Sequence, residues 1–209
     1  MEKVQHEKYV NTIKQFPRKK RKLSKIYYPK TPQDVYNLIK KYDTLVGLGA
    51  GNTYSRIDES LSPIVGISSK RIDHIQPIKE SRLVKYVERR LDDPIVEHTK
   101  KIHKYLFNVG AGTTISAIND YLEKKNMMLP ITLHENDTIA GASQTGSHES
   151  GIHYGNICKY IHSFRLLFPN GDFVTVERTK KISKSSLVIA DDLLFNCIAC
   201  GLGSFGVLG

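Results

Sequence analysis

The spacing of apolar residues in the first part of the chain predicts an alternation of helix and strand. Thr31 is a good N-cap and Pro32 suits the first helical position, so a helix is expected to follow them. Short apolar runs at 44–47 and 64–67 predict strands on either side of a polar turn rich in glycine. The helical spacing is carried by Val35, Leu38 and Ile39.

The later part of the chain continues this alternation. An apolar run at 106–109 predicts a strand, and an amphipathic helix is expected over 113–125. Residues 163–176 are two alternating runs joined through Asn170-Gly171, a strong hairpin signal, and 191–200 predict a last helix. These elements predict an α+β fold of two lobes with mixed sheets. The buried stripe of the first of these helices is expected to be Ile115, Ile118, Tyr121 and Leu122.

Residues 70–104 interrupt the pattern with a charged stretch around 86–93. They predict a helical excursion on the surface, and they contain no recognisable chemistry.

Most of the net charge of +10 lies near the N-terminus. Residues 1–41 hold 12 Lys or Arg against 3 Asp or Glu, whereas residues 42–209 hold 19 against 18. The basic run at 17–22 can contact nucleic acid or act as a nuclear-import signal, although such a run is more often a solvated terminal segment. No recognition helix or zinc-finger spacing accompanies it.

The cysteine content bears on the cellular compartment. The chain has 3 cysteines, no signal-like N-terminus and no long apolar run. These features indicate a reducing compartment and no membrane span. We therefore expect a cytoplasmic protein, with a nuclear location open through the basic run at 17–22.

The loop at 46–57 contains Gly47, Gly49 and Gly51 between an apolar run and a polar turn. Glycines allow positive φ angles and leave no side chains between the backbone N–H groups and a ligand. Such a loop can form a nest for a phosphate, but a tight turn has the same composition. The glycines alone leave both interpretations open.

Residues 138–155 are rich in glycine and hydroxyl side chains and nearly lack large apolar ones. The segment therefore cannot build a core, and it is either a solvated loop or a stretch that lies along a polar ligand. Ser and Thr hydroxyls can donate to phosphate oxygens. His148 and His153 could be metal ligands, but no carboxylate or third histidine stands at ligand spacing, so no metal is expected.

Two motifs near the C-terminus are weaker. Cys197 and Cys200 form a C-x-x-C, which suits a redox pair or half a zinc site, yet they fall in an apolar helical pattern. We interpret them as small residues on a buried helix face. Gly201, Gly203 and Gly206 match the dinucleotide motif G-x-G-x-x-G, but that motif needs a strand before it and a helix after it, and here a helix precedes it.

Six motifs in a fixed order resemble the FAD-binding domain of the vanillyl-alcohol oxidase and p-cresol methylhydroxylase (PCMH-type) superfamily. The chain is most similar to its aldonolactone oxidases, which act on gulonolactone and arabinonolactone. The motifs lie at 29–35, 47–55, 107–112, 139–151, 170–172 and 201–207.

The resemblance implies two α+β lobes with FAD between them. The organisation would then be a basic arm at 1–30, a first lobe at 31–112 that carries the 70–104 insertion, and a second lobe at 113–209. The opening loop would hold the pyrophosphate, the second segment would follow the pyrophosphate, ribitol and flavin, and the last would lie near the adenine or the ring. By resemblance, the cofactor residues are Gly47, Gly49, Ala50, Gly51, Asn52 and Thr53; Ala140, Gly141, Thr145, Gly146, Ser147, His148 and Gly151; and Gly203, Gly206 and Val207.

Two departures from the family limit what the resemblance implies. Family oxidases continue into a cap domain that binds substrate and supplies most catalytic side chains, and no cap is identified in this sequence. Catalytic residues are therefore unassigned, and oxidation of a sugar lactone or other small alcohol is expected to need a cap or a partner chain. In many lactone oxidases an opening-loop histidine bonds covalently to the flavin. Asn52 stands at that position, so FAD is expected to be held non-covalently.

The alternative to a flavin-linked oxidoreductase is a non-enzymatic protein. It would keep the flavin scaffold and bind nucleic acid through the basic run at 17–22.

Overall fold

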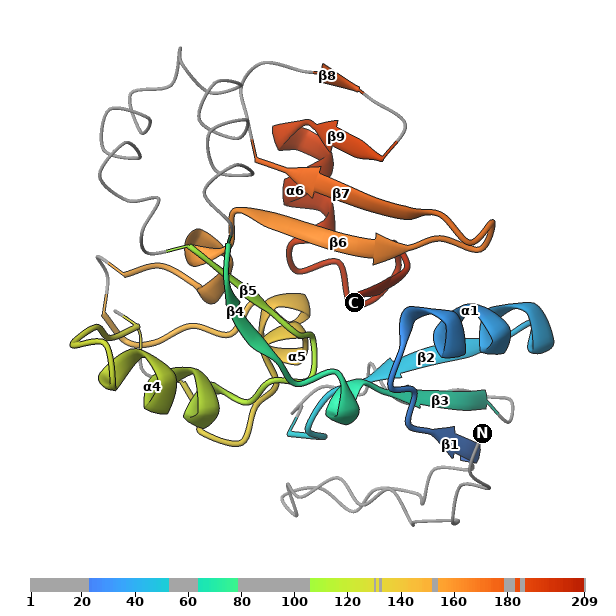
Figure 1. Ribbon diagram of the computed structural model, residues 1–209, viewed down its shortest axis with the longest axis horizontal. Coiled ribbons are helices and arrows are strands. Elements are labelled where there is room, and N and C mark those ends of the chain that lie inside the picture. Colours follow the sequence, from blue (N-terminus) through green and yellow to red (C-terminus); the bar gives the residue numbers. More distant parts are fainter. Residues whose placement is uncertain are drawn as a thin grey trace.

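The structure is a computed structural model of the 209-residue chain. It describes residues 23–52, 64–78, 106–129, 131, 133–151, 154–178, 183–184 and 187–208. Within these ranges the chain folds into two main sheets with helices packed on and between them (Figure 1). No helix in the described part of the chain is long and apolar enough to span a membrane.

The first sheet is small and parallel. It consists of β1 (Leu23–Tyr27), β2 (Leu45–Leu48) and β3 (Ile64–Ser68) in the order β1-β3-β2. The predicted strands at 44–47 and 64–67 are confirmed. β1 was not expected, since it falls within the proposed basic arm at 1–30. Its partner β3 lies about forty residues later, and parallel pairing over such a distance leaves no local signal in the sequence.

Helix α1 (Pro32–Lys41) lies between the two main sheets (Figure 1). It begins as predicted: the Thr31 side chain accepts from the Asp34 N–H, and the Asp34 carboxylate accepts from the Thr31 N–H. The apolar face of α1 packs against residues of both sheets. This core consists of Val35, Leu38, Ile67 and Leu167.

A short antiparallel pair connects the lobes. β4 (Ile75–Pro77) pairs with β5 (Phe107–Val109), and a single 3-10 turn, η1 (Ser69–Arg71), precedes it. The predicted helical excursion at 70–104 is therefore wrong over its first part, because β4 is a strand whose partner lies beyond the insertion. Residues 79–105 lie outside the described residues.

Helix α4 (Ile115–Glu123) follows β5, close to the predicted helix. Ile115, Ile118 and Leu122 are buried, and Tyr121 packs against them at the edge. The glycine-rich segment that follows contains the short helix α5 (Ile139–Gln144) and then η3 (Ile157–Tyr160). α4 and α5 share a set of partly buried neighbours that includes Leu129 and Leu133.

The second main sheet is mixed, as expected. Its order is β10-β6-β7-β9-β8, and only β7 and β9 are parallel. The predicted hairpin is confirmed, with Gly171 at φ +92° in its turn. The strands are β6 (Ser163–Leu167), β7 (Phe173–Glu177), β8 (Ser183–Lys184), β9 (Val188–Ala190) and β10 (Val207–Leu208).

Helix α6 (Asp192–Ile198) covers one face of this sheet (Figure 1). Its buried residues Phe195 and Ile198 join the core beneath β6 and β7. The placement of Cys197 and Cys200 on a buried face is wrong, because both are exposed. Apolar residues occur on every side of this short helix, so its sequence does not reveal which side is buried.

Candidate cofactor site

The glycine loop after β2 touches helix α5 of the other lobe. A Cβ atom on Gly49 would lie 3.2 Å from the Gly141 Cα and 3.1 Å from the Thr138 Oγ1. A Cβ on Gly141 would likewise lie 3.0 Å from the Thr138 Oγ1. The close approach depends on glycine at position 49, since a Cβ on Gly141 would lie 3.5 Å from the Gly49 Cα, an ordinary contact. The contact brings the first two predicted cofactor segments together.

The loop itself is open on one side. Of its glycines only Gly51 has a positive φ, at +83°, and a Cβ on Gly47 would meet nothing within 4 Å. Within the described residues, the N–H groups of Gly49, Ala50 and Gly51 donate to no protein acceptor. Successive N–H groups without acceptors, beside a residue in the left-handed conformation, are elements of an anion-binding nest.

Asn52 fixes the end of this loop. Its Nδ2 donates to the Asp137 Oδ1 at 2.8 Å, and Asp137 directly precedes Thr138, the N-cap of α5. The side chain is partly buried. The Asn52 side chain therefore links the glycine loop to the residue that precedes α5.

Helix α5 offers little backbone to a ligand at its own N-terminus. The N–H of Ile139 donates to Thr113 O, that of Ala140 to Ala111 O, and that of Gly141 to the Thr138 hydroxyl. All three are thus used within the protein. The glycine and hydroxyl content of this segment serves in part to pack and cap a short helix.

The turn after α5 carries exposed polar groups. The Thr145 hydroxyl donates to Gly141 O at 2.9 Å and lies 3.3 Å from the Ser147 hydroxyl. Gly146 between them has φ +63°, and a Cβ there would lie 2.9 Å from the Cys200 Sγ. Gly146 is therefore required by the protein's own packing, whatever ligand is bound.

Gln144 joins α5 to the third predicted segment. Its Oε1 accepts from the Gly203 N–H at 2.9 Å, and its Nε2 donates to Ile198 O at 3.0 Å. A Cβ on Gly203, which has φ +79°, would meet nothing within 4 Å. Gln144 was not among the residues selected from the sequence. The only hint was a long amide side chain in a run of small residues.

The remaining predicted residues lie apart from this cluster. His148 is exposed and pairs with Asn156 in an isolated bridge, and Gly151 packs against the Tyr154 ring. Gly206 and Val207 pack along β6 at Leu167. Thr53, His153 and the basic run at 17–22 lie outside the described residues. In the part of the chain that the structure describes, no group of His, Cys, Asp or Glu could hold a metal.

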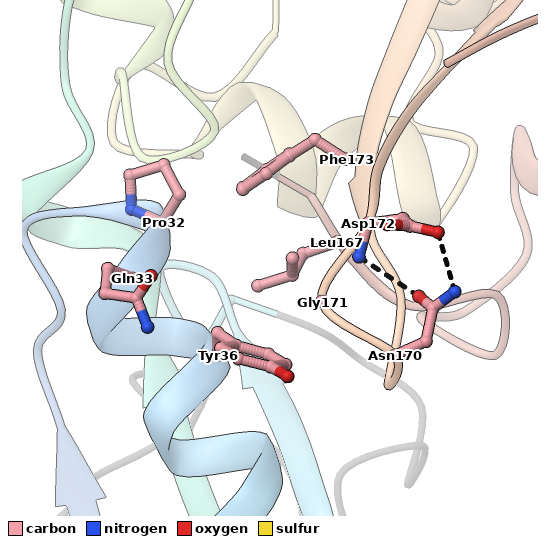
Figure 2. Close-up of a pocket in the computed structure, with 8 residues that line it drawn as sticks. All are labelled: Pro32, Gln33, Tyr36, Leu167, Asn170, Gly171, Asp172 and Phe173. Atoms are coloured by element: carbon pink, nitrogen blue, oxygen red, sulfur yellow. Dashed lines mark hydrogen bonds between the residues drawn. The ribbon is translucent and has the colours of Figure 1, made fainter. Parts of the chain in front are cut away.

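Two cavities lie beside α1. One, of about 230 Å³, separates the first turn of α1 from the β6–β7 turn (Figure 2). There Tyr36 lies so close to Gly171 that a Cβ on the glycine would be 2.7 Å from the ring. Asn170 and Asp172 hydrogen-bond to each other across the turn. None of the predicted cofactor residues lines this cavity.

The other cavity, of about 200 Å³, is lined by Val207 and by basic side chains from distant parts of the chain. Lys30, Arg71 and Arg165 meet there with His74, opposed by Asp73. Their charge favours an anionic ligand. These basic residues come from distant parts of the sequence, so no motif indicates the group.

Comparison with known families decides the identity of the scaffold. A family model described as FAD binding domain matches residues 24–177. The chain belongs to this family. The match confirms the resemblance stated from the sequence motifs, the α+β fold and FAD as the cofactor of the domain.

Relatives of this FAD-binding domain are longer proteins. The domain is 22% identical over 194 residues to the D-arabinono-1,4-lactone oxidase of Candida albicans. This match covers 88% of the present chain and 30% of the oxidase. An alkyldihydroxyacetonephosphate synthase structure has the same fold, with a TM-score of 0.60, 18% identity, and coverage of 88% of this chain and 30% of that one. The chain spans less than a third of either protein.

Proposed function

We propose that this FAD-binding domain serves an FAD-linked oxidoreductase that oxidises a sugar lactone or a related small alcohol. The observation that carries the proposal is the Gly49–Gly141 contact, which joins an open glycine loop to a second segment rich in hydroxyl groups. The match to the FAD-binding family and the similarity to a lactone oxidase support the same function. Bound FAD would supply the hydride acceptor.

The diphosphate of FAD would lie against the open side of the glycine loop. The N–H groups of Gly49, Ala50 and Gly51, which have no acceptor among the described residues, would donate to its oxygens. The half-buried Ser147 hydroxyl would add a donor from the second lobe, since the proton of the neighbouring Thr145 hydroxyl already goes to Gly141 O. Gly203 leaves room for close approach of the cofactor on the third segment.

Turnover would need a further substrate-binding part, either another segment of the polypeptide or a partner chain. The relative named for lactone oxidation is more than three times as long as its region of match. None of the described residues near the glycine loop is an evident acid or base for lactone chemistry. The role of this chain would be to hold and orient the cofactor.

A Gly47→Val variant tests the cofactor site most cleanly. Gly47 lies in β2, its φ is not left-handed, and its Cβ position is empty, so the apoprotein should accept the side chain without clash. The melting temperature of the apoprotein should change by no more than about 2 °C. The FAD dissociation constant, measured by flavin fluorescence quenching, should rise at least roughly tenfold.

The matched control is Ala117→Val, which adds similar bulk at an exposed position of α4. It should leave FAD affinity unchanged. Equal FAD affinity in Gly47→Val and the wild-type chain would overturn the placement of the cofactor along this loop. A wild-type chain that takes up no FAD on titration would overturn the proposed function itself.

A further inference from the structure

The three cysteines of the chain are not equivalent. Cys158, in η3, is buried, whereas Cys197 and Cys200 at the end of α6 are exposed. The sulfur atoms of Cys158 and Cys200 are 4.0 Å apart, although 42 residues separate them in sequence. Cys200 belongs to the C-x-x-C motif, but its sulfur faces Cys158, which lies outside that motif.

The apposition of these two sulfurs is built into the backbone. The Cys158 Sγ lies 3.3 Å from Ser143 O, and the Cys200 N–H donates to that same carbonyl at 3.1 Å. Cys200 also has φ +62°, a left-handed conformation that is unusual for a residue other than glycine. Two hydrogen-bonded contacts to one carbonyl of α5 therefore hold both cysteines in register.

We propose that Cys158 and Cys200 are a redox modification site, which peroxide converts reversibly into a disulfide that staples η3 to the loop after α6. Exposed Cys200 is the residue that the oxidant meets, and buried Cys158 is the resolving partner. The two sulfurs need to approach by about 2 Å to reach bonding distance. A side-chain rotation of exposed Cys200 is a small movement of this size.

The reaction balances with hydrogen peroxide as the oxidant. The Cys200 thiolate attacks one peroxide oxygen, the O–O bond breaks, and hydroxide leaves, which gives a sulfenic acid on Cys200. The Cys158 sulfur then attacks the Cys200 sulfur and the S–O bond breaks. The proton from Cys158 and the departing hydroxide form water. In total, two thiols and one peroxide give one disulfide and two waters.

The environment of Cys158 agrees with this order of events. Burial, together with the charge of a neighbouring Cys200 thiolate, raises the pKa of Cys158 to about 12, while Arg178 opposes the shift. Cys158 is therefore a protonated thiol that does not react first. Conversion of Cys200 to a neutral sulfenic acid removes the nearby negative charge and favours ionisation of Cys158 for the second step.

The staple would act where the cofactor segments meet. The residues after Cys200 pair with the end of α5: the N–H groups of Leu202 and Gly203 donate to the backbone and side chain of Gln144. A disulfide would fix this arrangement and constrain the unfolded chain over a long loop. The melting temperature should rise by roughly 5 to 15 °C.

The test uses the full chain without FAD, so its outcome is independent of the proposed function. The protein is treated with excess hydrogen peroxide, denatured in N-ethylmaleimide and weighed by mass spectrometry. One labelled thiol should remain instead of three, and peptide mapping should find the Cys158–Cys200 link. Dithiothreitol should restore three labelled thiols and the original melting temperature.

Single variants separate the pair from the motif. Cys197→Ser should form the link as the wild type does, whereas Cys200→Ser and Cys158→Ala should form none. Cys200 is exposed, so Cys200→Ser remains informative even if the buried variant folds poorly. A Cys197–Cys200 link, three free thiols after treatment, or oxidation of Cys200 to sulfinic acid with Cys158 still free would each overturn the proposal.

Discussion

Asn52 donates a hydrogen bond to Asp137 at 2.8 Å across 85 residues of sequence, and this bond joins the glycine loop of one lobe to the N-cap of α5 in the other. Close by, Gly49 and Gly141 touch through their backbones. A backbone contact between glycines has no side chain to hold it in place. The Asn52–Asp137 bond adds a side-chain link beside that contact.

Breaking this bond should loosen the cofactor site. Asn52→Ala should lower the free energy of unfolding by about 1 kcal/mol, the net value of a typical hydrogen bond. Asn52→Asp should cost more, because it sets two carboxylates against each other. Denaturant midpoints and FAD titrations measure both effects. Asn37→Ala, at an exposed position of α1, is the control that should change neither quantity.

Exchange of the two groups provides a sharper form of this test. In the double variant Asn52→Asp with Asp137→Asn, an amide donor again faces a carboxylate acceptor. Stability and FAD affinity should recover most of what Asn52→Asp loses, with a coupling energy of about 0.5–3 kcal/mol. Additive losses in the double variant would show that the bond does not couple the lobes.

FAD should be bound without a covalent link. An amide nitrogen is not a nucleophile because its lone pair is delocalised, and the Asn52 Nδ2 is also held in place by the N–H that it donates to Asp137. Acid precipitation of the FAD-loaded chain should leave all flavin in the supernatant, and the intact mass should equal that of the bare chain. A yellow pellet would contradict this expectation and direct attention to exposed His148.

The hydroxyls of the turn after α5 should contribute directly to FAD affinity. Ser147→Ala removes a donor from a half-buried position, whereas Thr145→Val removes an exposed hydroxyl whose proton already goes to Gly141 O; both nearly preserve side-chain volume. Ser147→Ala should weaken FAD binding by roughly tenfold, as expected for the loss of a hydrogen bond to a charged group, and Thr145→Val should weaken it less. Ser163→Ala, exposed on β6, is the matched control. Unchanged dissociation constants in both variants would remove these hydroxyls from the site.

Local signals in the sequence predicted the elements that are stabilised by residues close to one another in the sequence. Thr31 and Asp34 form a capping box within one helical turn, and Asn170-Gly171 makes a two-strand turn, so α1 and the β6–β7 hairpin were predicted closely. β1 and β4 were missed because each pairs with a strand thirty or more residues away. Pairing of this kind depends on the tertiary fold and has no local signature.

The candidate site shows the same division. The glycine loop was recognisable by composition, but the sequence could not show that Gly49 touches Gly141 or that Gly146 is needed against Cys200. Gln144 was missed because its role is defined by partners more than fifty residues away. The basic cavity of Lys30, Arg71 and Arg165 was missed for the same reason.

The 209-residue chain should oxidise aldonolactones negligibly by itself, even when loaded with FAD. Hydride transfer needs the substrate held against the flavin, and such positioning supplies roughly 7 to 11 kcal/mol in favourable cases. The comparison covers 30% of the relative named for this reaction. Stopped-flow reduction of bound FAD by a lactone is the measurement. Turnover on the order of 10 per second would contradict the need for a further part.

Burial of Cys158 should make the protein less stable at alkaline pH. The pKa of Cys158 is raised to about 12, whereas the pKa of a thiol in the unfolded chain is about 8.5. Between these values the folded state keeps a proton that the unfolded state releases. The free energy of unfolding should therefore be unaffected by this group below about pH 8 and fall as pH rises from about 9 to 12, with a slope that approaches about 1.4 kcal/mol per pH unit.

Other groups titrate in the same range, among them Tyr27 and Tyr42, so the difference between variants is the quantity to measure. Urea denaturation is followed from pH 7 to 10.5 under reducing conditions in the wild type, Cys158→Ala and Cys197→Ala. Cys158→Ala should lose stability less steeply as pH rises, because it has no thiol to ionise on unfolding. Cys197 is exposed, so its variant should follow the wild-type curve. Parallel curves for the wild type and Cys158→Ala would mean that the Cys158 thiol ionises as readily in the folded protein as in the unfolded chain, and the buried resolving thiol assigned to the disulfide would then have to be reassessed.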